Sequence, residues 1–95
     1  MCDIDQEALT RTQDDIYPSR YGGWDPEIRL CTLDQLPDEQ FDLVIIGTPP
    51  DTHFSLAKTV METKPPKVLL IEKPLCGPSL EGAQEIVELQ KSTGT

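Results

Sequence analysis

The chain has 95 residues, enough for one small domain or for a piece of a larger one. Hydrophobic residues make up 37% of it, so a core can form, but a chain this short gains little stability from one. The 8 basic and 17 acidic residues give a net charge of −9, which argues against binding to nucleic-acid phosphates or anionic membranes. The longest strongly apolar run, 43–47, is far shorter than the ~20 residues that a membrane span needs.

The N-terminus and the cysteines both indicate a cytoplasmic protein. The chain begins Met-Cys-Asp-Ile-Asp, which has neither the basic nor the apolar segment of a secretory signal. Cys2, Cys31 and Cys76 are odd in number and widely spaced, with no Cys-x-x-Cys pair and no histidine at ligand spacing. We therefore expect reduced thiols, no disulfide framework and no metal site.

The first residues predict the end of a strand that leads directly into a helix. Residues 1–5 form this junction, with Asp5 as the helix N-cap and Leu9 on the first apolar face. Pro18 and the pair Gly22–Gly23 are expected to end the helix.

A second strand and a loop follow. Apolar and polar residues alternate over 28–32, as in a short strand, and 33–40 predicts a turn of helix and a loop.

The second half of the chain gives clearer signals. Residues 41–47 are rich in β-branched residues and end at glycine, which is typical of a buried parallel strand. The chain then turns at 48–51, and Asp51 or Thr52 is expected to cap a helix that stops at Pro65–Pro66. Four apolar residues of this helix recur at helical spacing: Phe54, Ala57, Val60 and Met61.

Residues 68–71 predict the next buried strand, and Pro78–Ser79 is expected to begin the last helix. That helix would carry an apolar face of Leu80, Ala83, Ile86 and Val87. Strands thus alternate with helices, which indicates an α/β fold with a parallel sheet.

Ligands of open parallel sheets bind beyond the carboxyl ends of the strands, so the residues directly after each strand are the candidates for a site. They are Asp3 and Asp5 after the first strand; Thr48, Pro49, Pro50 and His53 after the third; and Glu72, Lys73 and Pro74 after the fourth.

Two of these stretches resemble a known family. Thr-Pro-Pro-Asp-Thr-His at 48–53 and Glu-Lys-Pro-Leu at 72–75 are similar to the Thr-Pro-x-x-x-His and Glu-Lys-Pro stretches of the Gfo/Idh/MocA (glucose–fructose oxidoreductase / inositol dehydrogenase) family. The opening Cys-Asp-Ile-Asp resembles the end of the second strand of its nucleotide domain. The resemblance implies a partial Rossmann-like, doubly wound sheet. It also implies a parent oxidoreductase that moves a hydride between a nicotinamide cofactor and a sugar, cyclitol or related alcohol.

The resemblance implies a role for each matching residue. Asp3 would accept hydrogen bonds from the adenosine ribose hydroxyls, which favours NAD and leaves NADP as the alternative. The loop Thr48–Pro50 would lie beside the nicotinamide ribose. Lys73 would be catalytic, reaching the substrate hydroxyl and the nicotinamide. Glu72 would make a hydrogen bond nearby and help to hold Lys73, and Pro74 would fix the backbone through a cis bond.

Each role has a structural alternative. Asp3 and Asp5 are alternatively helix caps, residues 48–50 an ordinary turn, and Lys73 a solvated surface lysine. His53 matches the family histidine of the cofactor-binding loop, but for this residue we favour local packing or hydrogen bonding over catalysis.

Features expected of a complete nucleotide domain are missing from these residues. No Gly-x-Gly-x-x-Gly loop occurs, and Gly22–Gly23 does not replace it because no helix follows. We interpret 1–95 as an incomplete NAD(P)-binding Rossmann domain, from the second strand onward and without the first strand and glycine loop. Such a chain would be inactive alone, and weakly stable unless its strands close the gap or another copy or partner donates a strand. The alternative is a non-catalytic, truncated α/β module that acts through protein–protein contacts.

Overall fold

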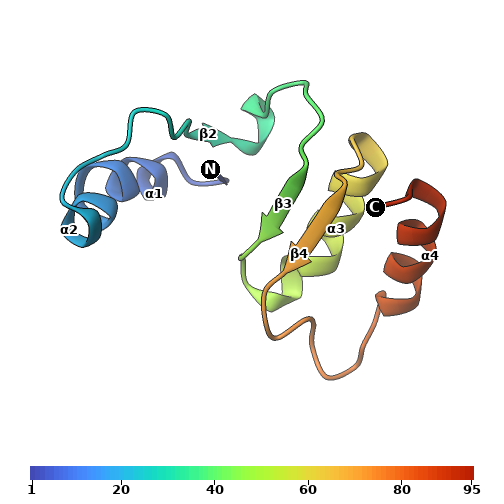
Figure 1. The fold of residues 1–95 in the computed structure, drawn as a ribbon. Helices are drawn as coiled ribbons and strands as arrows, with labels where there is room; N and C mark the ends of the chain where they lie inside the picture. Colours follow the sequence, from blue (N-terminus) through green and yellow to red (C-terminus); the bar gives the residue numbers. More distant parts are fainter. The chain divides into compact units, whose positions relative to one another are not determined.

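The computed structural model describes residues 1–95, which form two compact units (Figure 1). Unit 1 is Met1–Asp38 and unit 2 is Glu39–Thr95. The boundary between them falls at the end of 33–40, the segment that the sequence predicts as a turn of helix and a loop.

Unit 1 contains a two-stranded parallel sheet with a helical segment between its strands. Strand β1 (Cys2–Asp3) pairs with β2 (Cys31–Thr32), so that Cys2 lies opposite Cys31 and Asp3 lies opposite Thr32. A 3₁₀ turn, η2 (Leu33–Gln35), follows β2, as the sequence predicts. Both strands are shorter than expected.

The helical segment of unit 1 begins where the sequence predicts. Asp5 is the N-cap of α1 (Gln6–Arg11), and its side chain accepts a hydrogen bond from the backbone N–H of Glu7 at 2.9 Å. Leu9 is buried on the apolar face of this helix.

The prediction that Pro18 ends the helix is wrong. After α1 the chain widens into a π-helical turn, η1 (Thr12–Ile16), and continues as α2 (Tyr17–Tyr21), which contains Pro18. The N–H of Tyr17 donates to the carbonyl of Thr12, five residues back. This wider turn accommodates a proline that lacks an N–H and would crowd the carbonyl four residues back in a regular α-helix. The helix ends instead at Gly22, whose φ is 84°.

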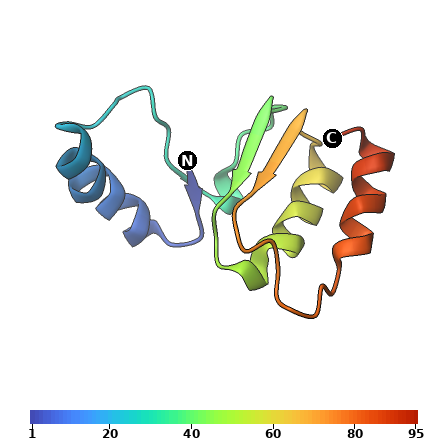
Figure 2. The same ribbon diagram turned by 60° about the horizontal axis from the view of Figure 1, so that its bottom comes forward.

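Unit 2 is a second parallel strand pair covered by two helices. Strand β3 (Leu43–Ile46) pairs with β4 (Val68–Ile71) along its whole length, from Leu43 opposite Val68 to Ile46 opposite Ile71. Helices α3 (His53–Thr63) and α4 (Ala83–Thr93) lie on the same side of this sheet in both views (Figures 1 and 2). Helix α3 stops just before Pro65–Pro66, as predicted.

The core of unit 2 lies between the sheet and the helices. Ile46, Ala57 and Met61 are its buried apolar residues. Around them pack the partly buried Val44, Leu56, Leu69, Ile71, Ile86 and Leu89.

The expectation that β3 and β4 are buried strands is wrong for one of their two faces. Successive residues of a strand point to opposite faces, and both helices of unit 2 cover the same face. The opposite face, which we call the outer sheet face, consists of Leu43, Ile45, Val68 and Leu70, whose exposed fractions lie between 43% and 59%.

One predicted helix start also differs from the structure. Pro78–Ser79 does not begin the last helix, because Leu80 and Gly82 have φ values of 55° and 85°, and α4 begins only at Ala83. Helix α3 begins directly after Thr52, one of the two predicted N-cap residues, but no side chain makes a capping hydrogen bond there. A 3₁₀ turn, η3 (Pro50–Thr52), precedes it, and the Thr52 hydroxyl donates back to the carbonyl of Pro49 at 2.7 Å.

The two strand pairs match the doubly wound order 3-2-1-4-5-6 when β1 is counted as strand 2. In that order strands 2 and 3 are neighbours, as are strands 4 and 5, and these correspond to β1–β2 and β3–β4. The chain therefore has the partial Rossmann-like α/β fold that the sequence predicts. None of its helices has the length and apolar character needed to cross a membrane.

Candidate functional site

Seven of the nine candidate site residues lie in two loops, or next to them, at the carboxyl end of the β3–β4 sheet. The strands are parallel and in register, so their carboxyl ends lie together. Beyond them, the N–H of Glu72 donates to the carbonyl of Ile46 at 2.9 Å. A Cβ on Gly47 would lie 3.9 Å from Cγ of Glu72. The two loops therefore start side by side.

Hydrogen bonds connect the first loop, Thr48–Pro50, to the residues just before α3. The hydroxyl oxygens of Thr48 and Thr52 lie 2.7 Å apart, and both the N–H and the hydroxyl of Thr52 donate to the carbonyl of Pro49. Thr48 and Pro49 are exposed, and Pro50 is half-buried. The loop thus presents its first two residues to solvent while hydrogen bonds fix its backbone.

The second loop, Glu72–Pro74, is exposed at all three residues. The Lys73–Pro74 peptide bond is cis, as the sequence analysis expects. The expectation that Glu72 makes a hydrogen bond nearby and helps to hold Lys73 stays a prediction. No carboxylate pairs with the Lys73 ammonium, so its charge faces solvent.

His53 connects the two loops. Its side chain is fully buried, its Nε2 lies 2.7 Å from the carbonyl oxygen of Thr48, and its Nδ1 lies 3.1 Å from the carbonyl oxygen of Leu75. Both partners only accept hydrogen bonds, whereas a neutral imidazole has one N–H, so the neutral ring donates to one of them at a time. This is the local hydrogen-bonding role that the sequence analysis favours for His53.

The sequence analysis missed two contributors to this arrangement. The carbonyl of Leu75 has no signal in the sequence, because every residue carries the same group. The second is the Thr52 hydroxyl, which lies 2.7 Å from that of Thr48; the sequence predicts Thr52 only as a helix cap.

The other two candidates, Asp3 and Asp5, lie in unit 1, with Asp3 at the end of β1. The carboxylate of Asp3 is exposed, and one of its oxygens accepts a hydrogen bond from the N–H of Asp5 at 2.9 Å. Asp5, not Asp3, caps α1. The second carboxylate oxygen of Asp3 accepts no hydrogen bond within the chain.

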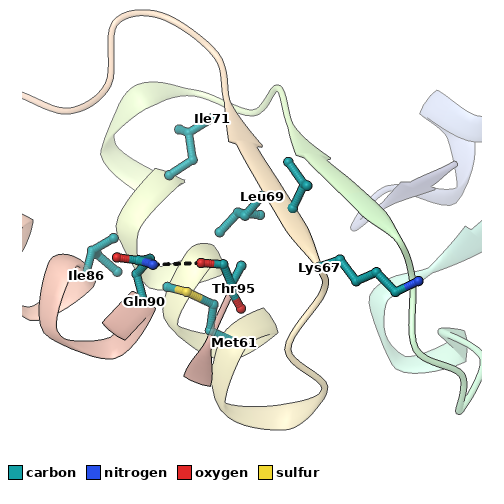
Figure 3. Close-up of a pocket in the computed structure, with 8 residues that line it drawn as sticks. Met61, Lys67, Leu69, Ile71, Ile86, Gln90 and Thr95 are labelled. Atoms are coloured by element: carbon teal, nitrogen blue, oxygen red, sulfur yellow. Dashed lines mark hydrogen bonds between the residues drawn. The ribbon is translucent and has the colours of Figure 1, made fainter. Parts of the chain in front are cut away.

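A depression of about 330 Å³ lies elsewhere, on the helix-covered side of β4 (Figure 3). Gln90 donates a hydrogen bond to the carbonyl of Thr95 there at 2.8 Å. The depression is lined by Met61, Lys67, Val68, Leu69, Ile71, Ile86, Gln90 and Thr95. None of them is a candidate site residue. No group of three or more His, Cys, Asp or Glu side chains is placed to hold a metal ion.

Comparisons with known proteins agree with the fold. The model of the Gfo/Idh/MocA family, described as an oxidoreductase family with an NAD-binding Rossmann fold, matches residues 6–95. Asp3 therefore lies outside the matched residues.

One curated relative is the uncharacterized oxidoreductase YdgJ of Escherichia coli (strain K12), which is 42% identical to this chain over 57 residues. Those residues are 60% of this chain but 16% of the relative, so the similarity spans a small part of that protein. No solved structure gives a significant match.

Proposed function

This chain belongs to the Gfo/Idh/MocA family of NAD-binding oxidoreductases, and from that premise we propose that it supplies part of the cofactor and substrate site of such an enzyme. The proposed reaction moves a hydride between the nicotinamide and a sugar, cyclitol or related alcohol. One observation carries the proposal: two loops at neighbouring strand ends are joined through His53, and one of them presents the unpaired ammonium of Lys73.

In this proposal Lys73 is the catalytic residue. An exposed ammonium with no carboxylate partner is free to donate a hydrogen bond to an alcohol oxygen of the substrate. It holds that oxygen in place and stabilises the negative charge that develops on it when the alcohol loses its proton. Glu72 and Pro74 flank Lys73 and set the direction of its backbone.

Residues of both units suit the ribose and nicotinamide ends of the cofactor. The free oxygen of Asp3 suits a ribose hydroxyl, and its negative charge would repel a 2′-phosphate, so we propose NAD rather than NADP. Thr48, Pro49 and Pro50 would lie along the nicotinamide ribose, with His53 holding their loop. The bound nicotinamide supplies or accepts the hydride.

The pyrophosphate end of the cofactor has no matching donors among these residues. The 95 residues contain no glycine-rich loop whose N–H groups would hold the phosphates. We therefore propose that 1–95 corresponds to an incomplete domain, from the second strand onward, and that the chain alone neither binds the dinucleotide tightly nor turns over. The proposal includes a cytoplasmic location, which is compatible with three free cysteines.

The role of Lys73 is tested by Lys73→Met in an oxidoreductase of full family length that carries this segment. We expect turnover to fall about 10²–10⁴-fold, the usual contribution of a proton-transfer or charge-stabilising group, while the Kd for NADH stays the same. The matched control is Lys67→Met, because Lys67 is an exposed lysine that precedes β4 and pairs with Asp42 at 2.6 Å. Unchanged turnover in Lys73→Met would refute the catalytic role.

The inactivity of the isolated chain is tested separately, by equilibrium dialysis of the 95-residue protein against NADH. We expect no saturable binding at micromolar concentrations. A micromolar Kd would overturn the claim about the isolated chain and leave the role of Lys73 in the larger enzyme unaffected.

A second function is favoured by a different observation. The outer sheet face is apolar and exposed, and Tyr17, Tyr21 and Trp24 form an aromatic group in unit 1, with ring centroids 4.7 and 5.2 Å apart. Such surfaces suit a non-catalytic module that binds a second copy or a strand-donating partner. Unchanged turnover in Lys73→Met would support this alternative.

A further inference from the structure

Two of the three cysteines are direct neighbours in the sheet of unit 1. Cys2 in β1 and Cys31 in β2 are paired residues of a parallel ladder, 29 positions apart in the chain. Paired residues of neighbouring strands carry their side chains on the same face, with the strands about 4.7–4.9 Å apart. Disulfides join residues whose Cα atoms are about 4.4–6.8 Å apart, so this register suits a disulfide without movement of the backbone.

The two thiols interact in the structure. Partial burial, together with the charge and the hydrogen bond of the Cys31 side chain, raises the pKa of the Cys2 thiol from its ordinary value of 9.0 to about 11. The Cys31 sulfur also lies 3.9 Å from the carbonyl oxygen of Met1, to which its thiol donates. Both cysteines are free and only partly buried, so small reagents can reach them.

We propose that Cys2 and Cys31 form a dithiol site that a low-molecular-weight disulfide, such as glutathione disulfide, converts into an intrachain disulfide. The site is independent of the proposed cofactor chemistry, because it uses none of the candidate site residues. Cys76 lies in the other unit and takes no part.

The chemistry is two successive exchange reactions. One cysteine, as its thiolate, attacks glutathione disulfide: a protein–glutathione S–S bond forms, the glutathione S–S bond breaks, and one glutathione thiolate leaves. The other cysteine loses its proton to solvent and attacks the protein sulfur of the mixed disulfide. The Cys2–Cys31 bond forms and a second glutathione thiolate leaves. The two cysteines lose two electrons, which reduce glutathione disulfide to two glutathione molecules.

The test is incubation of the folded 95-residue chain with excess glutathione disulfide, followed by thiol counting and mass spectrometry after trypsin digestion. We expect two of the three thiols to be lost, a decrease in mass equal to two hydrogen atoms, and a cross-link between tryptic peptides 1–11 and 30–58. Because the pKa of Cys2 is raised, the reaction should accelerate as the pH rises toward 11.

Three controls make the result specific. Cys76→Ser should form the same cross-link, whereas Cys31→Ser should form none and should accumulate a glutathione adduct on Cys2. The same incubation in concentrated urea should lose this selectivity, because the ladder that brings the two sulfurs together is absent. Stable adducts on both cysteines, a cross-link to Cys76, or an equally fast and selective Cys2–Cys31 cross-link in urea would each overturn the proposal.

Discussion

His53 shows how a single buried side chain can determine the geometry of a site that lies on exposed loops. The ring makes contact with the carbonyls of Thr48 and Leu75, which belong to segments that follow two different strands. Their relative position is therefore fixed from inside unit 2, while Lys73 and the exposed part of the first loop remain open to solvent.

We predict that His53→Ala lowers the free energy of unfolding of unit 2 by about 2–4 kcal/mol. The variant leaves a cavity and removes the partner of two carbonyls, and each buried polar group without a partner costs about 1–3 kcal/mol. Urea unfolding followed by far-UV circular dichroism measures the change.

Two further variants are compared with His53→Ala for their loss of stability. His53→Gln keeps one amide donor and should lose less stability than His53→Ala. Ser55→Ala removes only an exposed hydroxyl that donates to the carbonyl of Thr52, and it should stay within about 0.5 kcal/mol of the natural chain. If His53→Ala unfolds at the same urea concentration as Ser55→Ala, the contacts of His53 with the two carbonyls contribute nothing to the stability of unit 2.

At the residue scale, the sequence predicts local features better than distant contacts. Asp5 was predicted as the N-cap, and it is, because capping depends only on residues two or three positions away. The Nδ1 partner of His53 could not be predicted, because it is a backbone carbonyl 22 positions later. The pairing of Cys2 with Cys31 depends on strand register, which spacing along the chain does not reveal.

At the scale of elements, helix α4 shows how a tight turn overrides an apparent helix start. The chain adopts positive φ at Leu80 and Gly82, and α4 begins immediately after Gly82. A Cβ on Gly82 would lie 3.3 Å from Cδ2 of Phe54 in α3. The glycine is therefore required both by its backbone conformation and by the close packing of Phe54 against it.

We predict that Gly82→Ala destabilises unit 2 by about 1–2 kcal/mol, because an L-residue is strained in the left-handed conformation. Gly77→Ala is the matched control: Gly77 does not have a positive φ, and a Cβ there would meet no atom within 4 Å. Urea midpoints of the two variants give the comparison. Equal midpoints would show that the turn before α4 accommodates the alanine side chain without loss of stability.

The existence and type of the larger elements of unit 2 were predictable, and their exact beginnings were less so. β3, β4 and the end of α3 follow from β-branched runs and from Pro65–Pro66. The start of α3 directly after Thr52 agrees with the prediction. The start of α4 was misplaced, because Pro78–Ser79 carries the usual residue types of a helix start but lies in a turn. In unit 1, the π-helical turn before Pro18 has no sequence signature that we recognised.

For the whole molecule, the main departure from expectation is burial. Only five apolar residues in the chain are buried: Leu9, Ile46, Ala57, Met61 and Pro66. The apolar run 41–47 was interpreted as a strand covered on both faces, yet in unit 2 both helices cover one face. Sequence patterns report that a face is apolar but not what covers it, so the outer sheet face could not be predicted.

We predict that the outer sheet face causes the isolated chain to self-associate as its concentration rises, since exposed apolar strands promote pairing between molecules. The double variant Ile45→Thr/Leu70→Thr should remain monomeric, because threonine keeps the strand preference but removes apolar surface. Sedimentation velocity over a range of concentrations measures both.

Val44→Thr is the control for this prediction, because Val44 lies in the same strand but packs against the core. It should lower the stability of unit 2 and leave self-association through the outer face in place. A natural chain that sediments as a monomer at every concentration would contradict the prediction.

The aromatic group of unit 1 determines which part of this protein intrinsic fluorescence reports on. Trp24 is the only tryptophan, and both tyrosines, Tyr17 and Tyr21, lie in the same unit. Tryptophan and tyrosine fluorescence therefore reports on unit 1, while unit 2, with seven of the nine candidate site residues, contains neither tryptophan nor tyrosine. A tryptophan placed in unit 2, for example at the exposed and isolated position of Gly77, would give the candidate site its own spectroscopic signal.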